Sequence, residues 1–301
     1  MRLEDHDVEA ADKIKEFFAG ESNYVFEKII EAGSSAVIVC VQNKNAGPRG
    51  FRKIAVKTAT WTNRDIGPET ECLAPLIWAQ HIVTMIKIPF ESKDTAWIRD
   101  NTIITEYLEN GTLRDFMERL KRDDPARKIP NRVLWAIFLC LVRACIGIAY
   151  PPGDPKKAPS GPKDQILETL PPNLNTRPPS KLAHSDLHEG NIMFTDFDSI
   201  EHRRFPALKL IDFGMSVERT EGVEENILSV GENKRRLHPN LDSDLLTLVA
   251  QCLDRNPAKR PTLSRLLSVI RPKLEQTYPN IRQESDRNIS DLVQKYLFDA
   301  A

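Results

Sequence analysis

An apolar stretch at residues 133–150 most narrowly limits what this chain can fold into. It reads VLWAIFLCLVRACIGIAY and contains one charged residue, Arg143. Its 18 residues meet the length of a membrane-spanning helix, but a helix buried on all sides in a large core has the same composition. Because a charge at the centre of a lipid-embedded helix is costly, Arg143 favours a buried core helix.

The overall composition is that of a soluble globular protein, with 41% hydrophobic and 28% charged residues. A length of 301 residues suits one large two-lobed domain or two smaller domains. The formal net charge of −1 gives no general attraction to nucleic acid or acidic membranes. We therefore expect neither as a partner, and a substrate must be recognised locally.

Cysteine use indicates a reducing, intracellular compartment, cytoplasmic or nuclear. The five cysteines are scattered and show no CxxC or other metal-ligand spacing. Most have apolar neighbours, where a free thiol behaves as a small hydrophobic residue, and we expect Cys140, Cys145 and Cys252 to be core thiols. The chain also starts with an acidic amphipathic segment, which lacks the apolar centre of a signal peptide. The cysteines are Cys40, Cys72, Cys140, Cys145 and Cys252.

Hydrophobic periodicity predicts helices and strands along most of the chain. Helical spacing of apolar residues predicts helices, and β-branched runs between turn signals predict strands. The predicted helices span 5–19, 68–81, 110–122, 133–149, 243–254, 262–276 and 286–298. The predicted strands span 24–32, 35–41, 51–59, 81–91, 96–108, 192–196 and 207–213.

Proline marks two further features. Pro75 predicts a kink or an early stop in the helix that begins near Pro68. Residues 151–180 carry nine of the 21 prolines, so this segment cannot form a helix or a central strand. We expect an exposed insertion or linker there.

Four separated motifs carry candidate chemistry. AVK (55–57) places Lys57 at the end of an apolar strand, and Glu69 follows twelve residues later near the start of a helix. HSDLHEGN (184–191) supplies Asp186 and Asn191, and IDFG (211–214) supplies Asp212 after the next strand. Each motif alone is a weak signal, but together they form an ordered, spaced set.

This order and spacing resemble the protein-kinase superfamily, from about Tyr24 to about Pro272. The resemblance implies an α+β, bilobal protein-kinase-like fold with a small β-rich N-terminal lobe and a mainly helical C-terminal lobe. It implies an N-terminal helical extension at 1–23, an N-lobe at 24–106, a C-lobe at 107–276 with the proline-rich insertion at 151–181, and a helical tail at 277–301. A membrane span at 133–150 would separate Lys57 from Asp186, so the resemblance also favours a core helix.

The resemblance implies roles for the motif residues, with ATP and Mg²⁺ as substrate and cofactor. Lys57 would neutralise the ATP phosphates, and Glu69, rather than Glu71, would hold Lys57. Asp186 would be the catalytic aspartate, and Asn191 and Asp212 would bind magnesium.

The resemblance also implies an adenine site. Thr105 would be the gatekeeper of a hinge, and backbone groups of Glu106 and Leu108 would meet the base. Four apolar residues would lie above and below it: Ile30, Ile38, Ala55 and Met193.

The sequence departs from the family at several points. Glu31, Gly33 and Ala36 stand where the glycine-rich loop has three glycines, which implies weaker ATP binding. Ser185 replaces an arginine of the catalytic loop, and His188 replaces the lysine of serine/threonine kinases. After Gly214 the activation segment is not visible, and NILSVG (226–231) resembles a helix of the larger lobe only twelve residues later.

These departures leave three functions open. The first is a protein kinase that phosphorylates a Ser/Thr-type hydroxyl of an unknown protein. The second is a pseudokinase that acts as a scaffold or binding module. The third is a small-molecule kinase, which the Asp-Leu-His sequence before Asn191 favours.

Overall fold

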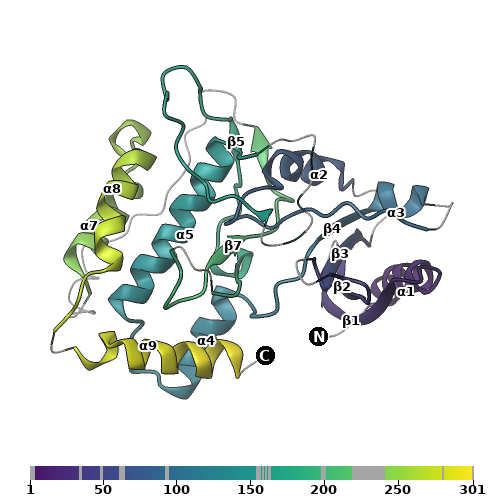
Figure 1. Cartoon of the computed structure of the whole chain (residues 1–301), viewed down its shortest axis with the longest axis horizontal. Helices are drawn as coiled ribbons and strands as arrows, with labels where there is room; N and C mark the ends of the chain where they lie inside the picture. Colours follow the sequence, from purple (N-terminus) through teal and green to yellow (C-terminus); the bar gives the residue numbers. More distant parts are fainter. Residues whose placement is uncertain are drawn as a thin grey trace.

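The computed structural model describes residues 4–299 except 34–35, 48–49, 61–64, 92–94, 154–156, 158, 160, 162–163, 198–200, 219–240 and 280. The segment at 226–231, expected to be a helix of a larger lobe, lies outside the described residues. The fold is mixed α/β, with an antiparallel sheet in the N-terminal region and several helices later in the chain (Figure 1). This arrangement is compatible with a bilobal fold.

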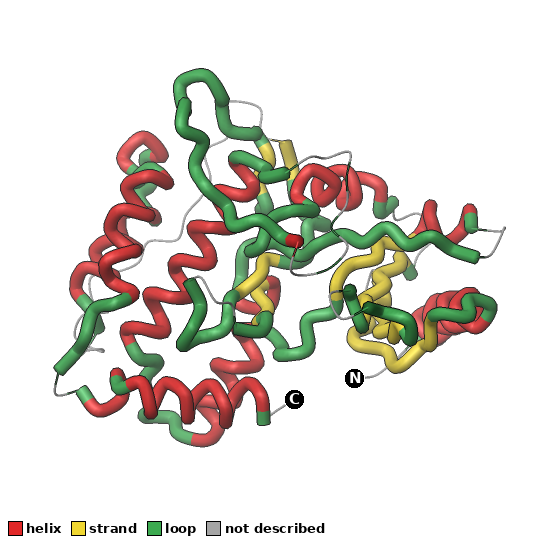
Figure 2. The backbone as a smooth tube through the Cα atoms, in the orientation of Figure 1, coloured by secondary structure: helices red, strands yellow, loops and turns green. Residues whose placement is uncertain are grey.

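The N-terminal sheet has four antiparallel strands in sequential order. They are β1 (Tyr24–Ala32), β2 (Ala36–Asn43), β3 (Lys53–Ala59) and β4 (Thr102–Glu106). Burial alternates along β3, so one face of the strand is fully buried and the other only partly buried. In Figure 2 these strands gather at one end of the molecule and most helices lie toward the other.

Helix α1 (Asp5–Ala19) covers the buried face of this sheet. Ile14 and Phe18 of the helix join a core with Val39 and Val56 of the strands. Burying side chains of this size contributes about 2 kcal/mol each. The predicted N-terminal helix and the first three predicted strands are therefore confirmed. Helix α1 covers one face of the sheet, and the other face remains only partly buried.

The segment between β3 and β4 differs from the prediction in two places. Residues 81–91 form no strand; Ile82 and Met85 make only isolated β-bridges, to Leu210 and Thr105. Residues 96–101, predicted as strand, form helix α3 (Ala96–Asn101), which buries Ile98 in the core of the sheet. Both runs are rich in the residues that strands favour. Their apolar side chains nevertheless pack into the core from a loop and from a short helix.

Helix α2 (Gly67–Leu73) ends early, as Pro75 predicted. The chain continues as a short 3₁₀ helix, η1 (Ala74–Leu76), because proline cannot donate the hydrogen bond that an α-helix needs. The predicted helix at 68–81 is therefore correct in its first half and wrong in its second half.

The later helices match the predicted ones. They are α4 (Leu113–Asp123), α5 (Asn131–Ala149), α7 (Ser243–Cys252), α8 (Leu263–Leu274) and α9 (Asp286–Val293), which continues as a π-helical turn, η6 (Gln294–Phe298). Two short 3₁₀ helices, η4 (Pro257–Lys259) and η5 (Arg282–Glu284), lie between them. Thr112 begins α4 with a reciprocal pair of hydrogen bonds to Asp115.

Helix α5 is a core helix, as predicted. It has the length and hydropathy of a membrane span, but 67% of its most apolar 18-residue window is buried. Its apolar side chains pack against α7 and α8 on one side and against the central core on the other. Arg143 is fully buried and ion-paired with Glu201, a partner that lipid would not supply.

The proline-rich insertion is only partly an exposed linker. Residues 172–180 are exposed, and the described residues of 151–180 form no regular helix or strand. Glu168, however, is fully buried and binds His81. The expectation of an exposed insertion is therefore wrong for the part around Glu168, because its carboxylate has a buried partner.

Two short strand pairs frame the motif loops. Strands β6 (Ile192–Phe194) and β7 (Leu208–Leu210) pair with each other, and β5 (Leu182–Ala183) pairs with β8 (Val217–Glu218). A 3₁₀ turn, η3 (Glu189–Asn191), precedes β6. Loop 184–191 therefore connects β5 to β6, and loop 211–214 lies between β7 and β8.

Candidate functional site

Lys57 lies on the partly buried face of the N-terminal sheet. Register pairs place it opposite Ile38 of β2 and Ile103 of β4, and place Ala55 opposite Thr105. Directly opposed residues of antiparallel strands share a face. Ile38, Ala55, Lys57 and Thr105, all predicted as site residues, therefore lie together on one face.

The ammonium of Lys57 binds the carboxylate of Glu69. Its Nζ atom lies 2.9 and 2.8 Å from the two carboxylate oxygens. Glu69 sits in the first turn of α2, where the helix dipole stabilises negative charge, and only 8% of the residue is exposed. Glu71 is exposed, so Glu69 is the partner of the lysine.

Asp212 is the second partner of Lys57. Its Oδ1 atom lies 2.8 Å from Lys57 Nζ and accepts a hydrogen bond of 3.3 Å from the Gly214 amide. Asp212 has a φ of 60°, in the left-handed region that costs about 1–2 kcal/mol for a residue other than glycine. The backbone is thus strained at the residue whose carboxylate contacts the lysine.

The two carboxylates fix the charge state of the cluster. Burial alone would lower the pKa of Lys57, but the charges of Glu69 and Asp212 and their hydrogen bonds outweigh it and raise the pKa. Burial likewise favours a higher pKa for Asp212, and the Lys57 ammonium reverses this and lowers it. Lys57 and Asp212 are therefore both charged at neutral pH, and each favours the charged form of the other.

Loop 184–191 brings Asp186 and Asn191 together. The Asn191 amide donates 2.9 Å to the backbone carbonyl of Asp186 and 3.1 Å to its Oδ2 atom. This contact orients the amide so that its oxygen points away from Asp186. Asn191 is buried, whereas 42% of the Asp186 side chain is exposed. The partly exposed Asp186 carboxylate is therefore held in place by the hydrogen bond from the buried Asn191 amide.

The backbone joins this loop to the Asp212 loop. The Ile211 amide donates 2.9 Å to the Asn191 carbonyl. The buried His184 ring bonds the Ile211 carbonyl at 2.9 Å through Nε2, and its Nδ1 atom accepts from the Asp186 amide at 3.3 Å. Burial lowers the pKa of His184 despite these contacts, so a neutral imidazole joins the two loops.

His188 lies beside Asp186 on the open side of the loop. Its Nε2 atom lies 3.6 Å from Asp186 Oδ2, and its Nδ1 atom accepts from the Gly190 amide at 3.0 Å. Arg114 of α4 lies 3.2 Å from the same Nδ1 atom and pairs with Glu189 at 3.1 Å. His188 thus lies between the Asp186 carboxylate and the Arg114–Glu189 ion pair.

The remaining predicted adenine-site residues lie around the sheet and β6. Ile30 is partly buried on β1, and Gly33 is exposed in the β1–β2 turn, where its amide donates to the Ala36 carbonyl. Leu108 is buried just after β4. Met193 is only partly buried, on the face of β6 opposite to the core residues beside it.

Glu106 has a structural side chain that the sequence reasoning missed. Its Oε1 atom accepts from the Thr84 amide at 2.8 Å and from Gln165 at 3.0 Å, and it forms an ion pair with buried Lys209. Its own amide donates to the Thr84 carbonyl. Glu106 therefore ties β4 to β7 through its side chain, besides its predicted place in a hinge.

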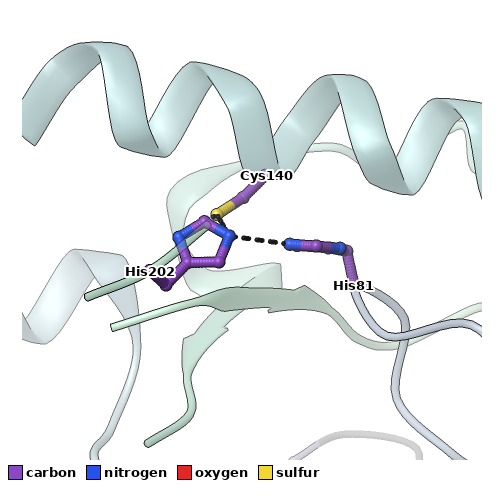
Figure 3. Close-up of side chains that lie close together, drawn as sticks. All are labelled: His81, Cys140 and His202. Atoms are coloured by element: carbon purple, nitrogen blue, oxygen red, sulfur yellow. Dashed lines mark hydrogen bonds between the residues drawn. The ribbon is translucent and has the colours of Figure 1, made fainter. Parts of the chain in front are cut away.

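A second buried polar cluster was not predicted at all. It contains His81, Cys140 and His202, which come from three distant parts of the chain (Figure 3). The cysteine was predicted as a simple core thiol, and neither histidine was singled out. Separations of 59 residues or more leave no local spacing pattern by which such a cluster could be found.

The comparisons with known proteins assign the chain to no family. No protein-family model matches it, and no curated protein matches it in sequence.

Proposed function

We propose that this chain is an ATP-dependent phosphotransferase of protein-kinase type. The proposal rests on one observation: the ammonium of Lys57, on the partly buried face of the sheet, binds the carboxylates of both Glu69 and Asp212. A lysine held by a helix glutamate beside a second aspartate is the arrangement needed to bind and orient phosphate groups. The hinge and the small β-rich lobe that go with this function are part of the proposal.

Asn191 and Asp212 would hold Mg²⁺. Magnesium prefers oxygen ligands, and the two residues offer an amide oxygen and a carboxylate on adjacent loops joined by the Ile211–Asn191 hydrogen bond. The side chain of Asp212 is 43% exposed, so its carboxylate is accessible. The donor set therefore fits this ion, which would neutralise phosphate charge when bound.

Asp186 would be the catalytic aspartate. It would accept the proton of an acceptor hydroxyl whose oxygen attacks the γ-phosphorus of ATP, while the bond to the β–γ bridging oxygen breaks and ADP leaves. The half-exposed carboxylate and the fixed amide of Asn191 support this role. Lys57 would offset the negative charge on the phosphates.

The adenine would occupy the partly buried face of the sheet. Ile38, Ala55 and Thr105 share this face with Lys57, and Met193 lies on the partly buried face of β6. Ile30 and Leu108 flank the sheet. An apolar surface with a charged group at one end suits a nucleotide, whose base is flat and whose phosphates are anionic.

Two observations favour the alternative functions, a binding module and a small-molecule kinase. Glu31, near the end of β1, and Gly33, in the β1–β2 turn, are both exposed. A carboxylate at Glu31 would repel phosphates, which favours a binding module with weak or no catalysis. His188 lies 3.6 Å from the Asp186 carboxylate, where a protein kinase carries lysine, which favours a small-molecule acceptor.

Phosphate transfer from labelled ATP tests the proposal. Purified chain would be incubated with Mg²⁺ and, in turn, with mixed protein acceptors and with sugars and amine alcohols. We expect transfer to protein, reduced at least about 100-fold in Asp186→Asn, while Asp196→Asn, an exposed control, behaves as the unaltered chain.

The alternative outcomes are distinct. Turnover stimulated only by a sugar or an amine alcohol would replace the protein acceptor with a small molecule. A folded chain that binds MgATP but transfers phosphate to no acceptor would be a binding module, and the phosphotransferase proposal would be wrong.

A further inference from the structure

Three potential metal ligands that are not among the proposed nucleotide-site residues meet in the core. His81 comes from the loop after η1, Cys140 from the middle of α5 and His202 from the loop before β7 (Figure 3). The exposed fractions of the three residues are 0%, 1% and 1%. The Nε2 atoms of the two histidines face each other at 3.1 Å, and the Cys140 sulfur lies 3.7 Å from His202 Nε2 and 3.9 Å from its Nδ1.

These separations are close to those of ligands around one tetrahedral zinc ion. Zinc binds imidazole nitrogen at about 2.0–2.1 Å and thiolate sulfur at about 2.3 Å, so two nitrogens lie roughly 3.3 Å apart and nitrogen and sulfur roughly 3.6 Å apart. We propose that His81, Cys140 and His202 form a buried site for a thiolate- and imidazole-binding transition-metal ion, with zinc as the best fit. Three protein ligands leave the fourth position to a water molecule.

Glu168 supplies the outer support that metal-binding histidines usually have. Its Oε2 atom lies 2.7 Å from His81 Nδ1, and its Oε1 atom accepts from the His81 amide at 2.6 Å. A carboxylate at Nδ1 leaves Nε2 to face the metal and makes it a better ligand.

Arg143 holds the two outer segments of the site in place. It follows Cys140 by almost one helical turn on α5 and pairs with Glu201, the residue before His202. It also donates a hydrogen bond to the backbone carbonyl of Glu168. The three ligands and their support are thus anchored to one rigid helix, as a precise metal site needs.

The site would stabilise the segment that leads to Asp212. The Leu208 amide of β7 donates to the Cys140 sulfur at 3.4 Å, and the Leu210 amide donates to the His81 carbonyl at 2.9 Å. Asp212 follows this strand by two residues. We therefore assign the ion a structural role, in which it ties β7 to α5 and to the loop that contains His81.

Metal titration of the full chain tests the proposal without any nucleotide. Chain stripped with a chelator would be titrated with Co²⁺, which replaces zinc and shows a sulfur-to-metal absorption band. We expect about one equivalent to bind, with the band lost in Cys140→Ser and kept in Cys252→Ser, a matched thiol control on α7. Glu168→Gln should weaken binding about 10–100-fold while keeping the band.

Thermal melting gives a second measurement in case a variant folds poorly. In the unaltered chain, Zn²⁺ should raise the melting temperature of the stripped protein by several degrees, and Mg²⁺ at the same concentration should not. The proposal is overturned if the folded chain shows no sulfur-to-cobalt band in excess Co²⁺, or if Cys140→Ser keeps the band. Neither result would bear on phosphate transfer.

Discussion

The side chains of Lys57 and Asp212 meet at 2.8 Å although 155 residues separate them along the chain. One belongs to the N-terminal sheet and the other to the loop after β7, so this contact joins the sheet to the region of the later helices. Glu69 completes the cluster from α2. Because one cation serves two carboxylates, its removal should affect stability as well as nucleotide binding.

Lys57→Met should lower the free energy of unfolding by about 2 kcal/mol. The change leaves the buried Glu69 carboxylate without its cation, and an unpaired buried charge is costly. Urea denaturation measures the loss. Lys53→Met is the matched control on the same strand, since Lys53 is paired with the partly exposed Glu27 and such pairs contribute about 0.2–1 kcal/mol. Equal losses in the two variants would show that the Lys57 cluster has no special energetic role.

The Glu106–Lys209 pair should show strong coupling. Both side chains are buried, so Glu106→Gln or Lys209→Met alone should cost about 3–5 kcal/mol by leaving one charge unpaired. The double variant should cost less than the sum of the two, because it leaves no isolated charge. Urea denaturation of all four proteins measures the coupling, and additive losses would contradict the buried ion pair.

Asp242 should contribute to stability in a pH-dependent way. It caps α7, accepts from the amides of Asp244 and Leu245 at 2.8 and 3.2 Å, and binds Tyr278 and Trp135. Burial would raise its pKa, but the Tyr278 hydroxyl, the amides and the Trp135 ring nitrogen lower it below 3.8. Its contribution is therefore complete above the unfolded pKa and is lost as pH falls through the folded pKa.

Asp242→Asn measures this contribution. The variant should be less stable by about 1 kcal/mol at neutral pH, and the difference from the unaltered chain should stay constant down to about pH 5 and shrink below about pH 4. Urea denaturation across this range follows it. A difference that grows in acid would contradict the lowered pKa of Asp242.

Local periodicity predicted the elements that bury one continuous face. The spacing of Ile14 and Phe18 gave α1, and the apolar run around Arg143 gave α5. It failed at residues 81–91 and 96–101, where strand-like residues enter the core through a loop and a short helix. What decides such segments is whether a neighbouring strand has a free edge to pair with, and that is a property of the assembled sheet.

The candidate site was predictable only where its residues lie in recognisable motifs. Lys57 and Asp212 were found through AVK and IDFG, and Glu69 through its spacing from Lys57. The structure brings the three together. His81, Cys140 and His202 carry no such motif, so their meeting depends on how three remote segments pack. Glu168 was hidden in a proline-rich stretch whose composition predicted only an exposed linker.

Calorimetric titration with ATP, with and without Mg²⁺, tests the central claim most directly. If Asn191 and Asp212 hold magnesium against the phosphates, ATP affinity should rise about tenfold or more when Mg²⁺ is added. This gain should disappear in Asp212→Asn and persist in Asp196→Asn. A folded chain that binds no ATP at millimolar concentration, or that gains nothing from Mg²⁺, would contradict the assignment of this cluster as a nucleotide site.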